Sequence, residues 1–252
     1  MLAASVVMLW PAGASAQSVL GAQGPAVPSD GRIHHLEVNG RRIAIWCRGA
    51  GSPTVILEHG IGYSVDSDSW ATVQAGVAAE TRVCRYDRAG AGESDRVKSG
   101  RSMPDLARDL LLLLNAARIP GPYILVGHSF GGLTMRYFAQ QYPERVIGMV
   151  LVDGSPPWAI TSGVVSSERL SYARVASQLK QLTRLGRIPL VVITRGLGLS
   201  PSWRAAQDQM LNLSPSSRQV IATGSDHWIQ LRKPNLVIGQ IFTVLHTIRR
   251  RS

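Results

Sequence analysis

The pentapeptide at residues 127–131, GHSFG, holds the side chain of this sequence that is best suited to covalent chemistry. It fits the pattern G-x-S-x-G, in which the serine stands at a sharp strand-to-helix turn with its hydroxyl group presented. An apolar run at 123–126 directly precedes it, and residues 133–141 have the pattern of a helix. This context predicts that Ser129 is a nucleophile and that the backbone N–H of Phe130 binds a developing oxyanion.

A serine hydroxyl becomes a good nucleophile only when a base removes its proton, so the chain must supply a histidine. Six histidines are available, and His227 is the predicted base because it lies in the polar loop 224–228 after a late predicted strand. His128 adjoins the serine but points the other way in this turn, which predicts a buried structural role. Three others fall in the first predicted hairpin or in the final predicted helix, where a surface or core role is expected: His34, His35 and His246.

The predicted elements alternate between strands and helices, and this alternation can position the two side chains. The first two strands, at 33–38 and 42–47, flank an Asn39-Gly40 turn and predict a β-hairpin. Near-continuous apolar strands separated by helices then predict one α/β domain with a mostly parallel central sheet and helices on both faces. Further strands are expected at 54–58, 81–86, 123–127, 146–152, 190–194 and 219–223, and helices at 70–79, 103–117, 133–141 and 235–249.

Residues at about 154–188 interrupt this alternation, because they lie between two strands but outnumber what a single crossover helix needs. Their apolar side chains, among them Trp158 and Tyr172, are able to cover a pocket. Two interpretations follow from the pattern, a short helical cap over the site or an ordinary long helical crossover.

Four motifs stand along the chain in a characteristic order: HGIG at 59–62, DRAGAGES at 87–94, GHSFGG at 127–132 and DHW at 226–228. Through these motifs the chain resembles the α/β-hydrolase fold family between residues 33 and 248. The resemblance implies the fold of that family and serine hydrolase chemistry that needs no cofactor.

The same resemblance implies roles for residues that local patterns leave open. The residue after the His-Gly pair donates the second oxyanion N–H in such enzymes, and this residue is Ile61 here. His59 is expected to buttress that loop. Residues 87–94 are expected to form a structural loop near the site, without a catalytic role.

The acid that orients the histidine does not stand where many members of that family have it. Many relatives carry an aspartate just after the strand that corresponds to 190–194, but residues 195–199 contain no carboxylate. Asp208, in a predicted helix, is the alternative acid. Asp153 is favoured because it ends the strand 146–152, at the sheet edge where catalytic groups collect in open α/β sheets. Its position also resembles that of the acid in haloalkane dehalogenases.

The resemblance thus implies a two-step acyl transfer by a triad of Ser129, His227 and Asp153, with the amides of Ile61 and Phe130 as the oxyanion hole. The expected substrate is a small molecule, a carboxylic ester with a small or medium hydrophobic group. Alternatives are a prolyl-type aminopeptidase or amidase, a thioesterase, and a non-catalytic binding protein of the same fold.

The beginning of the chain has the pattern of a targeting segment. The first 29 residues contain no Lys, Arg, Asp or Glu, and an apolar stretch at 1–10 precedes the small-residue run 14–16. This pattern predicts a signal peptide at 1–16, a flexible leader at 17–31, a domain at 32–252, and a secreted or periplasmic protein. No segment reaches the roughly 18 uninterrupted apolar residues that a membrane-spanning helix needs.

The formal net charge is +11, and a basic surface can steer anionic substrates or hold a protein near an anionic envelope. The basic residues are scattered and accompany no nucleic-acid motif, so solvated surface charge is favoured and no nucleic-acid partner is expected.

The two cysteines, Cys47 and Cys84, have no metal-site or redox-site spacing, and no metal is expected. Buried thiols are the ordinary interpretation for a cytosolic protein. Export, together with the strand order of the family that the chain resembles, predicts a disulfide between them.

Overall fold

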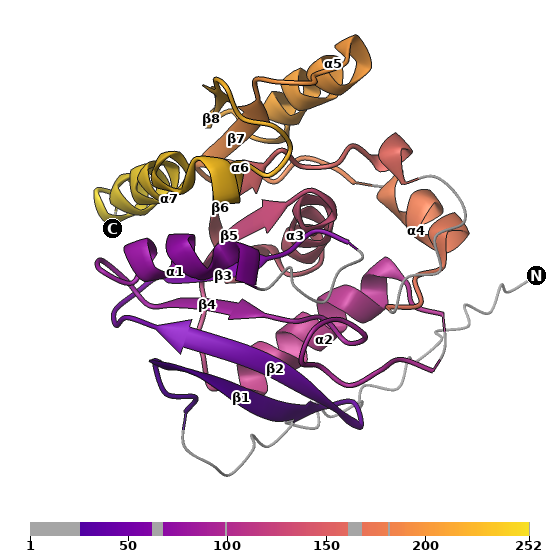
Figure 1. Cartoon of the computed structure of the whole chain (residues 1–252), viewed down its shortest axis with the longest axis vertical. Coiled ribbons are helices and arrows are strands. Elements are labelled where there is room, and N and C mark those ends of the chain that lie inside the picture. Colours follow the sequence, from indigo (N-terminus) through magenta and orange to yellow (C-terminus); the bar gives the residue numbers. More distant parts are fainter. Residues whose placement is uncertain (1–25, 62–67, 99, 161–167, 181, 252) are drawn as a thin grey trace, which may run out of the picture.

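The computed structural model describes residues 26–61, 68–98, 100–160, 168–180 and 182–251. It contains an eight-stranded sheet with the order β1-β2-β4-β3-β5-β6-β7-β8 (Figure 1). β2 pairs antiparallel with β1 and β4, and the other neighbours are parallel, which confirms the expected sheet. The strands are β1 (Asp30–Val38), β2 (Arg41–Arg48), β3 (Thr54–Glu58), β4 (Val83–Tyr86), β5 (Tyr123–His128), β6 (Val146–Val152), β7 (Leu190–Arg195) and β8 (Ser217–Ala222).

Helices cover both faces of the sheet (Figure 1). The helices α1 (Ala71–Val77) and α7 (Pro234–Arg249) pack together on one face, and α2 (Met103–Ala116) and α3 (Phe130–Gln141) pack together on the other. Successive side chains of a strand point to opposite faces, so each central strand supplies both cores. The other helical segments are α4 (Tyr172–Leu179), α5 (Pro201–Gln209), α6 (Ile229–Arg232) and the short turns η1 (Asp68–Trp70), η2 (Pro143–Arg145), η3 (Pro157–Ala159) and η4 (Met210–Leu213).

Element ends differ from expectation where local hydrogen bonds compete with the sheet. The strand expected from residue 81 begins at Val83, because Thr81 closes the turn after α1. The Thr81 N–H donates to the carbonyl of Val77 (3.3 Å), and its hydroxyl donates to the carbonyl of Pro53 (2.7 Å). At the other end, β1 begins at Asp30, ahead of the expected domain start at 32, and Val27 is already buried.

The segment at 154–188 contains η3 and the eight-residue helix α4 rather than one continuous crossover helix. Gln178 of α4 accepts a hydrogen bond from the N–H of Met103 at the start of α2 (2.9 Å), and Val175 and Leu179 are buried in the core on that side. Residues 161–167 and 181 lie outside the described residues. The segment therefore packs on α2, and its role as a cap stays a prediction.

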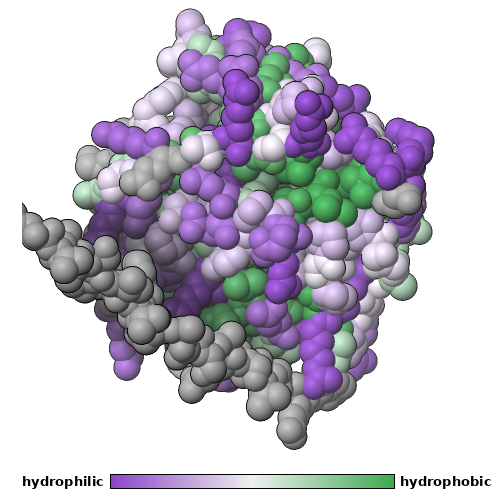
Figure 2. Space-filling model, turned by 180° about the vertical axis from the view of Figure 1, so that it is seen from behind, coloured by the Kyte–Doolittle hydropathy of each residue, from purple (hydrophilic) through white to green (hydrophobic). Residues whose placement is uncertain are grey.

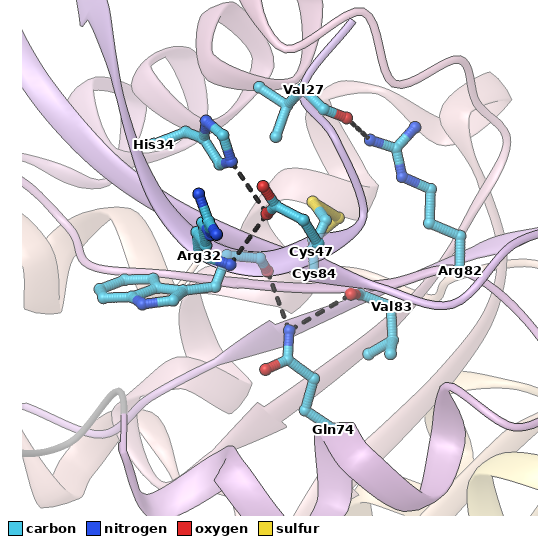
Figure 3. The surroundings of a disulfide bond; sticks show 10 residues. Val27, Arg32, His34, Cys47, Gln74, Arg82, Val83 and Cys84 are labelled. Atoms are coloured by element: carbon cyan, nitrogen blue, oxygen red, sulfur yellow. Dashed lines mark hydrogen bonds and ion pairs between the residues drawn. A yellow bond between two sulfur atoms is a disulfide. The ribbon is translucent and has the colours of Figure 1, made fainter.

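Cys47 and Cys84 form a disulfide, as predicted, and Figure 3 shows it between β2 and β4. The two residues face each other directly in the antiparallel pairing of these strands. On the neighbouring helix, Gln74 donates from Nε2 to the carbonyl of Trp46 (2.9 Å), next to the bridge. The disulfide thus joins the antiparallel edge of the sheet to its parallel part.

The surface in Figure 2, seen from behind the view of Figure 1, has hydrophilic side chains spread over it, with hydrophobic patches between them. In the described parts of the chain, no helix is both long and apolar enough to cross a bilayer. The predicted signal peptide at 1–16 and the expected leader up to residue 25 lie outside the described residues.

Candidate active site

Ser129 occupies the turn between β5 and α3, as the pentapeptide predicts. Its backbone has φ +53° and ψ −121°, a strained conformation for a residue with a side chain. The flanking glycines allow this turn. A Cβ atom on Gly127 would lie 2.4 Å from the carbonyl oxygen of Gly131, and one on Gly131 would lie 2.5 Å from that of His59. The sequence therefore folds into a tight elbow that leaves the serine partly accessible.

The hydroxyl of Ser129 lies 3.2 Å from that of Ser155, a residue that sequence reasoning did not single out. The backbone fixes this contact, because the N–H of Ser155 donates to the carbonyl of Ser129 (2.9 Å). The Ser129 N–H in turn donates to the carbonyl of Val152 at the end of β6 (3.1 Å). Among the described residues, no hydrogen bond joins the Ser129 hydroxyl to the His227 ring.

His227 and Asp153 are brought together by the fold. Nδ1 of His227 lies 2.5 Å from Oδ2 of Asp153. A carboxylate at Nδ1 favours the tautomer with its proton on that nitrogen, which leaves Nε2 with the free lone pair. The arrangement can therefore hold a histidine as a base and stabilise the imidazolium that forms when it takes up a proton.

Asp153 is fully buried at the carboxyl end of β6, with φ +42°. Its Oδ1 accepts hydrogen bonds from the indole Nε1 of Trp203 (3.1 Å) and from the N–H of Arg195 (3.4 Å). The Arg195 guanidinium lies 3.4 Å from Oδ2 and stacks over the Trp203 ring at 4.7 Å. A buried carboxylate needs such donors, and these fix its orientation towards the histidine.

Asp208, the alternative acid, does not contact His227. It is exposed on α5, and its carboxylate accepts a hydrogen bond from Nε2 of Gln219 on β8 (2.9 Å). Arg195 stands at the end of β7, where the sequence lacks the acid that many relatives carry. Of the two candidate acids, Asp153 therefore lies beside His227 and Asp208 does not.

The rings of His227 and His128 lie 4.6 Å apart, and Nε2 of His128 donates to the carbonyl of His227 (2.9 Å). Burial lowers the pKa of His128 to about 3, so this ring is neutral and acts as a support. The predicted buried role of His128 is confirmed. The Trp203 ring, perpendicular to that of His227 at 6.0 Å, also touches Trp158 at 6.1 Å, which places this residue of the expected cap near the site.

The two predicted oxyanion donors belong to segments that lie next to the serine. A Cβ atom on Gly60, which precedes Ile61, would lie 3.4 Å from Cβ of Ser129. Phe130 is the first residue of α3, so its N–H stands at the positive end of the helix dipole. Among the described residues, the N–H groups of Ile61 and Phe130 have no hydrogen-bond acceptor.

Sequence reasoning missed three residues at this site: Ser155, Trp203 and Arg195. Ser155 follows Asp153 by two positions, which is the one local signal it offers. Trp203 reaches the carboxylate through the packing of α5 against β7, and Arg195 reaches it from the end of the strand next to β6. The local sequence has no pattern that indicates either contact.

Comparisons with known proteins identify the family and the fold. The sequence model described as the alpha/beta hydrolase fold matches residues 53–185, more than half of the chain. YqjL of Bacillus subtilis is 27% identical over 217 residues, which cover 78% of this chain and 85% of YqjL. The putative carbamate hydrolase RutD of Azorhizobium caulinodans is 35% identical over 115 residues, 46% of this chain and 41% of RutD. The chain thus spans less than half the length of some curated relatives.

Two solved structures illustrate the likeness in fold. A putative lipase from Acinetobacter baumannii superposes with a TM-score of 0.71 at 19% identity, over 88% of this chain and 93% of that chain. A thermophilic esterase from Thermogutta terrifontis superposes with a TM-score of 0.68 at 18% identity, over 86% and 99%. At these identities the similarity concerns the fold alone.

Proposed function

Because the chain belongs to the α/β-hydrolase fold family, we propose that it is a serine hydrolase that cleaves a carboxylic ester of a small or medium hydrophobic substrate. The observation that carries this proposal is the buried Asp153 at 2.5 Å from Nδ1 of His227, beside a serine on a strained elbow. A binding protein of this fold has no need for an aligned acid and base.

In the proposed first step, Nε2 of His227 takes the proton of the Ser129 hydroxyl as its oxygen attacks the ester carbonyl. Asp153 stabilises the resulting imidazolium, and the N–H groups of Ile61 and Phe130 bind the oxyanion. The imidazolium then protonates the leaving alcohol. The hydrogen bond from serine to histidine often tightens only with substrate bound, so its absence in the described residues is compatible with this step.

In the second step, His227 takes a proton from water, and the hydroxide oxygen attacks the acyl carbon. The same two amides bind the second oxyanion, and collapse of this intermediate returns the proton to Oγ of Ser129. The acid product leaves, and the triad is restored.

An ester is favoured over a peptide by the chemistry of the cap segment. An aminopeptidase needs a carboxylate for the substrate amine, and Glu168 is the single carboxylate between residues 154 and 188. Both of its oxygens accept hydrogen bonds from Arg88, at 2.6 and 2.7 Å, and its side chain is fully buried. The names of two solved neighbours, an esterase and a lipase, also favour ester substrates.

A carbamate is the second candidate substrate, because the name of the relative RutD describes a putative carbamate hydrolase. Rates on p-nitrophenyl esters of increasing acyl length, compared with the matching p-nitroanilide and a phenyl carbamate, test the choice. We expect the highest kcat/KM on short to medium esters, and its loss in Ser129→Ala. A higher kcat/KM on the anilide or carbamate would contradict the ester assignment.

A further inference from the structure

The loop that follows β4 carries an arginine at the centre of a buried network. Arg88 is almost fully buried, and all five of its N–H donors have acceptors. Nε and one Nη2 hydrogen go to the two oxygens of Glu168, and one Nη1 hydrogen goes to Glu58. The remaining two go to backbone carbonyls, from Nη1 to His59 (2.8 Å) and from Nη2 to Gly60 (2.6 Å).

The carbonyl of Gly60 belongs to the same peptide group as the N–H of Ile61, the proposed oxyanion donor. A trans peptide is planar, so its C=O and N–H point in opposite directions. A hydrogen bond that holds the Gly60 oxygen therefore also sets the direction of the Ile61 N–H. A cation on the carbonyl also polarises the peptide and makes its N–H a stronger donor.

A second group acts on the same carbonyl. Nδ1 of His59 lies 2.7 Å from the Gly60 oxygen, and burial lowers the pKa of His59 to about 3. The neutral ring donates from Nδ1, and its Nε2 accepts from the N–H of Arg88 (3.4 Å). Arg88 thus holds this peptide both directly and through His59.

Two buried carboxylates hold the guanidinium in place. Glu58 ends β3, directly before the oxyanion loop, and also accepts a hydrogen bond from the hydroxyl of Tyr86. Glu168 comes from the segment at 154–188, 80 residues away from Arg88. Burial alone would raise the pKa of Glu168, but the charge and hydrogen bonds of Arg88 hold this pKa below its usual value. The bidentate contact fixes the plane of the guanidinium.

We propose that Arg88 is a positioning residue of the oxyanion hole: it aims and polarises the Gly60–Ile61 peptide, and Glu168 locks its guanidinium from the expected cap. This inference rests on the proposed serine hydrolase function. It gives Arg88 a functional role in the loop at 87–94, for which the sequence analysis predicts only a structural role.

Arg88→Lys tests the proposal, because an ammonium keeps the charge but has three donors on one nitrogen and cannot serve both carbonyls and both carboxylates. We expect kcat on a p-nitrophenyl ester to fall about 10- to 100-fold, less than the roughly 100- to 1000-fold that loss of a whole oxyanion donor costs. KM should change little. Arg82→Lys is the matched control. Arg82 directly precedes β4, and the substitution removes a guanidinium that donates to the carbonyl of Val27.

A thionoester separates positioning from a general structural role. Its sulfur uses an oxyanion hole poorly, so Arg88→Lys should lower the rate on the oxoester more than the rate on the matched thionoester. An equal loss on both substrates, or a kcat within two-fold of wild type, would overturn the proposal.

Glu168→Gln keeps Arg88 and carries the test if Arg88→Lys does not fold. We expect Glu168→Gln to lower the ratio of the oxoester rate to the thionoester rate, but by less than Arg88→Lys does. A ratio equal to that of the wild type would contradict the proposed role of Glu168 in holding the Arg88 guanidinium. Wild-type turnover of the oxoester, together with its loss in Ser129→Ala, establishes the hydrolase function independently of either result.

Discussion

His227 and Asp153 meet across the edge of the sheet, with Nδ1 and Oδ2 2.5 Å apart although 74 positions separate the two residues. The aspartate directly follows β6 and the histidine follows β8, so β7 lies between the strands that present them. Arg195 at the end of β7 points its charge at the same carboxylate. The place that an acid takes in many relatives is thus occupied here by a cation that supports an acid on the neighbouring strand.

The assignment of the acid predicts unequal effects of two matched substitutions. Asp153→Asn should lower kcat on an activated ester by about 10⁴-fold, because the amide favours the wrong histidine tautomer and cannot stabilise the imidazolium. Asp208→Asn changes an exposed side chain bound to Gln219 and should leave kcat within a few-fold of wild type. A large loss in Asp208→Asn alone would contradict the assignment.

Trp203 is expected to tune the triad through the carboxylate. Trp203→Phe keeps most of the ring but removes the indole donor that lies 3.1 Å from Oδ1 of Asp153. One lost hydrogen bond to a buried charge, worth about 1.5–3 kcal/mol, corresponds to a loss of about 10- to 100-fold in kcat/KM if all of it acts in the transition state. Trp158→Phe, on a residue that is 52% exposed, is the control. Equal kcat/KM values for the two variants would exclude this role.

The fold was predictable because its signals are local. The apolar runs that become β5, β6 and β7 are nearly continuous, and the serine elbow combines a strand, two glycines and a helix within a few positions. The order of motifs then located the histidine, and the end of β6 indicated Asp153. The serine and the favoured acid directly follow strands that the local pattern indicates, whereas the histidine loop was located with the help of the family resemblance.

The parts of the site that the sequence did not predict depend on contacts between distant segments. Trp203 reaches Asp153 from α5, and Arg88 binds Glu168 80 positions away, so neither contact has a signature in the local sequence. The segment at 154–188 fits both a cap and a long crossover helix, because it holds more residues than a single crossover helix needs and its apolar side chains are able to cover a pocket.

Two buried histidines predict a loss of stability in acid. Burial lowers the pKa of His59 and of His128 to about 3, whereas an unfolded chain has a histidine pKa of about 6.5. Between these values the unfolded state binds protons that the folded state does not. The free energy of unfolding should therefore fall as the pH drops from about 6.5 towards about 3, by up to about 1.4 kcal/mol per pH unit for each histidine.

Urea unfolding across this pH range measures the slope. His128→Gln, whose amide can still donate to the carbonyl of His227, should flatten the slope, and His35→Gln on the exposed hairpin should not. A slope in His128→Gln as steep as in wild type would show that His128 does not contribute.

The disulfide should stabilise the protein mainly by restricting the unfolded chain. Cys47 and Cys84 are 37 positions apart, and a loop of that size corresponds to about 3–4 kcal/mol in the chain-entropy account. The double variant Cys47→Ala, Cys84→Ala should lose about this much free energy of unfolding. Titration that finds two free thiols in denatured, unreduced wild-type protein would contradict the bridge. The predicted export of the protein stays a prediction.

The central claim is that the hydroxyl of Ser129 is the nucleophile, and a fluorophosphonate probe tests it most directly. Wild-type protein should take up one probe, and peptide mass spectrometry should place it on Ser129. Ser155→Ala, which removes the hydroxyl 3.2 Å away, should still be labelled, whereas Ser129→Ala should not. Labelling that persists in folded Ser129→Ala, or no labelling of folded wild-type protein, would contradict the account.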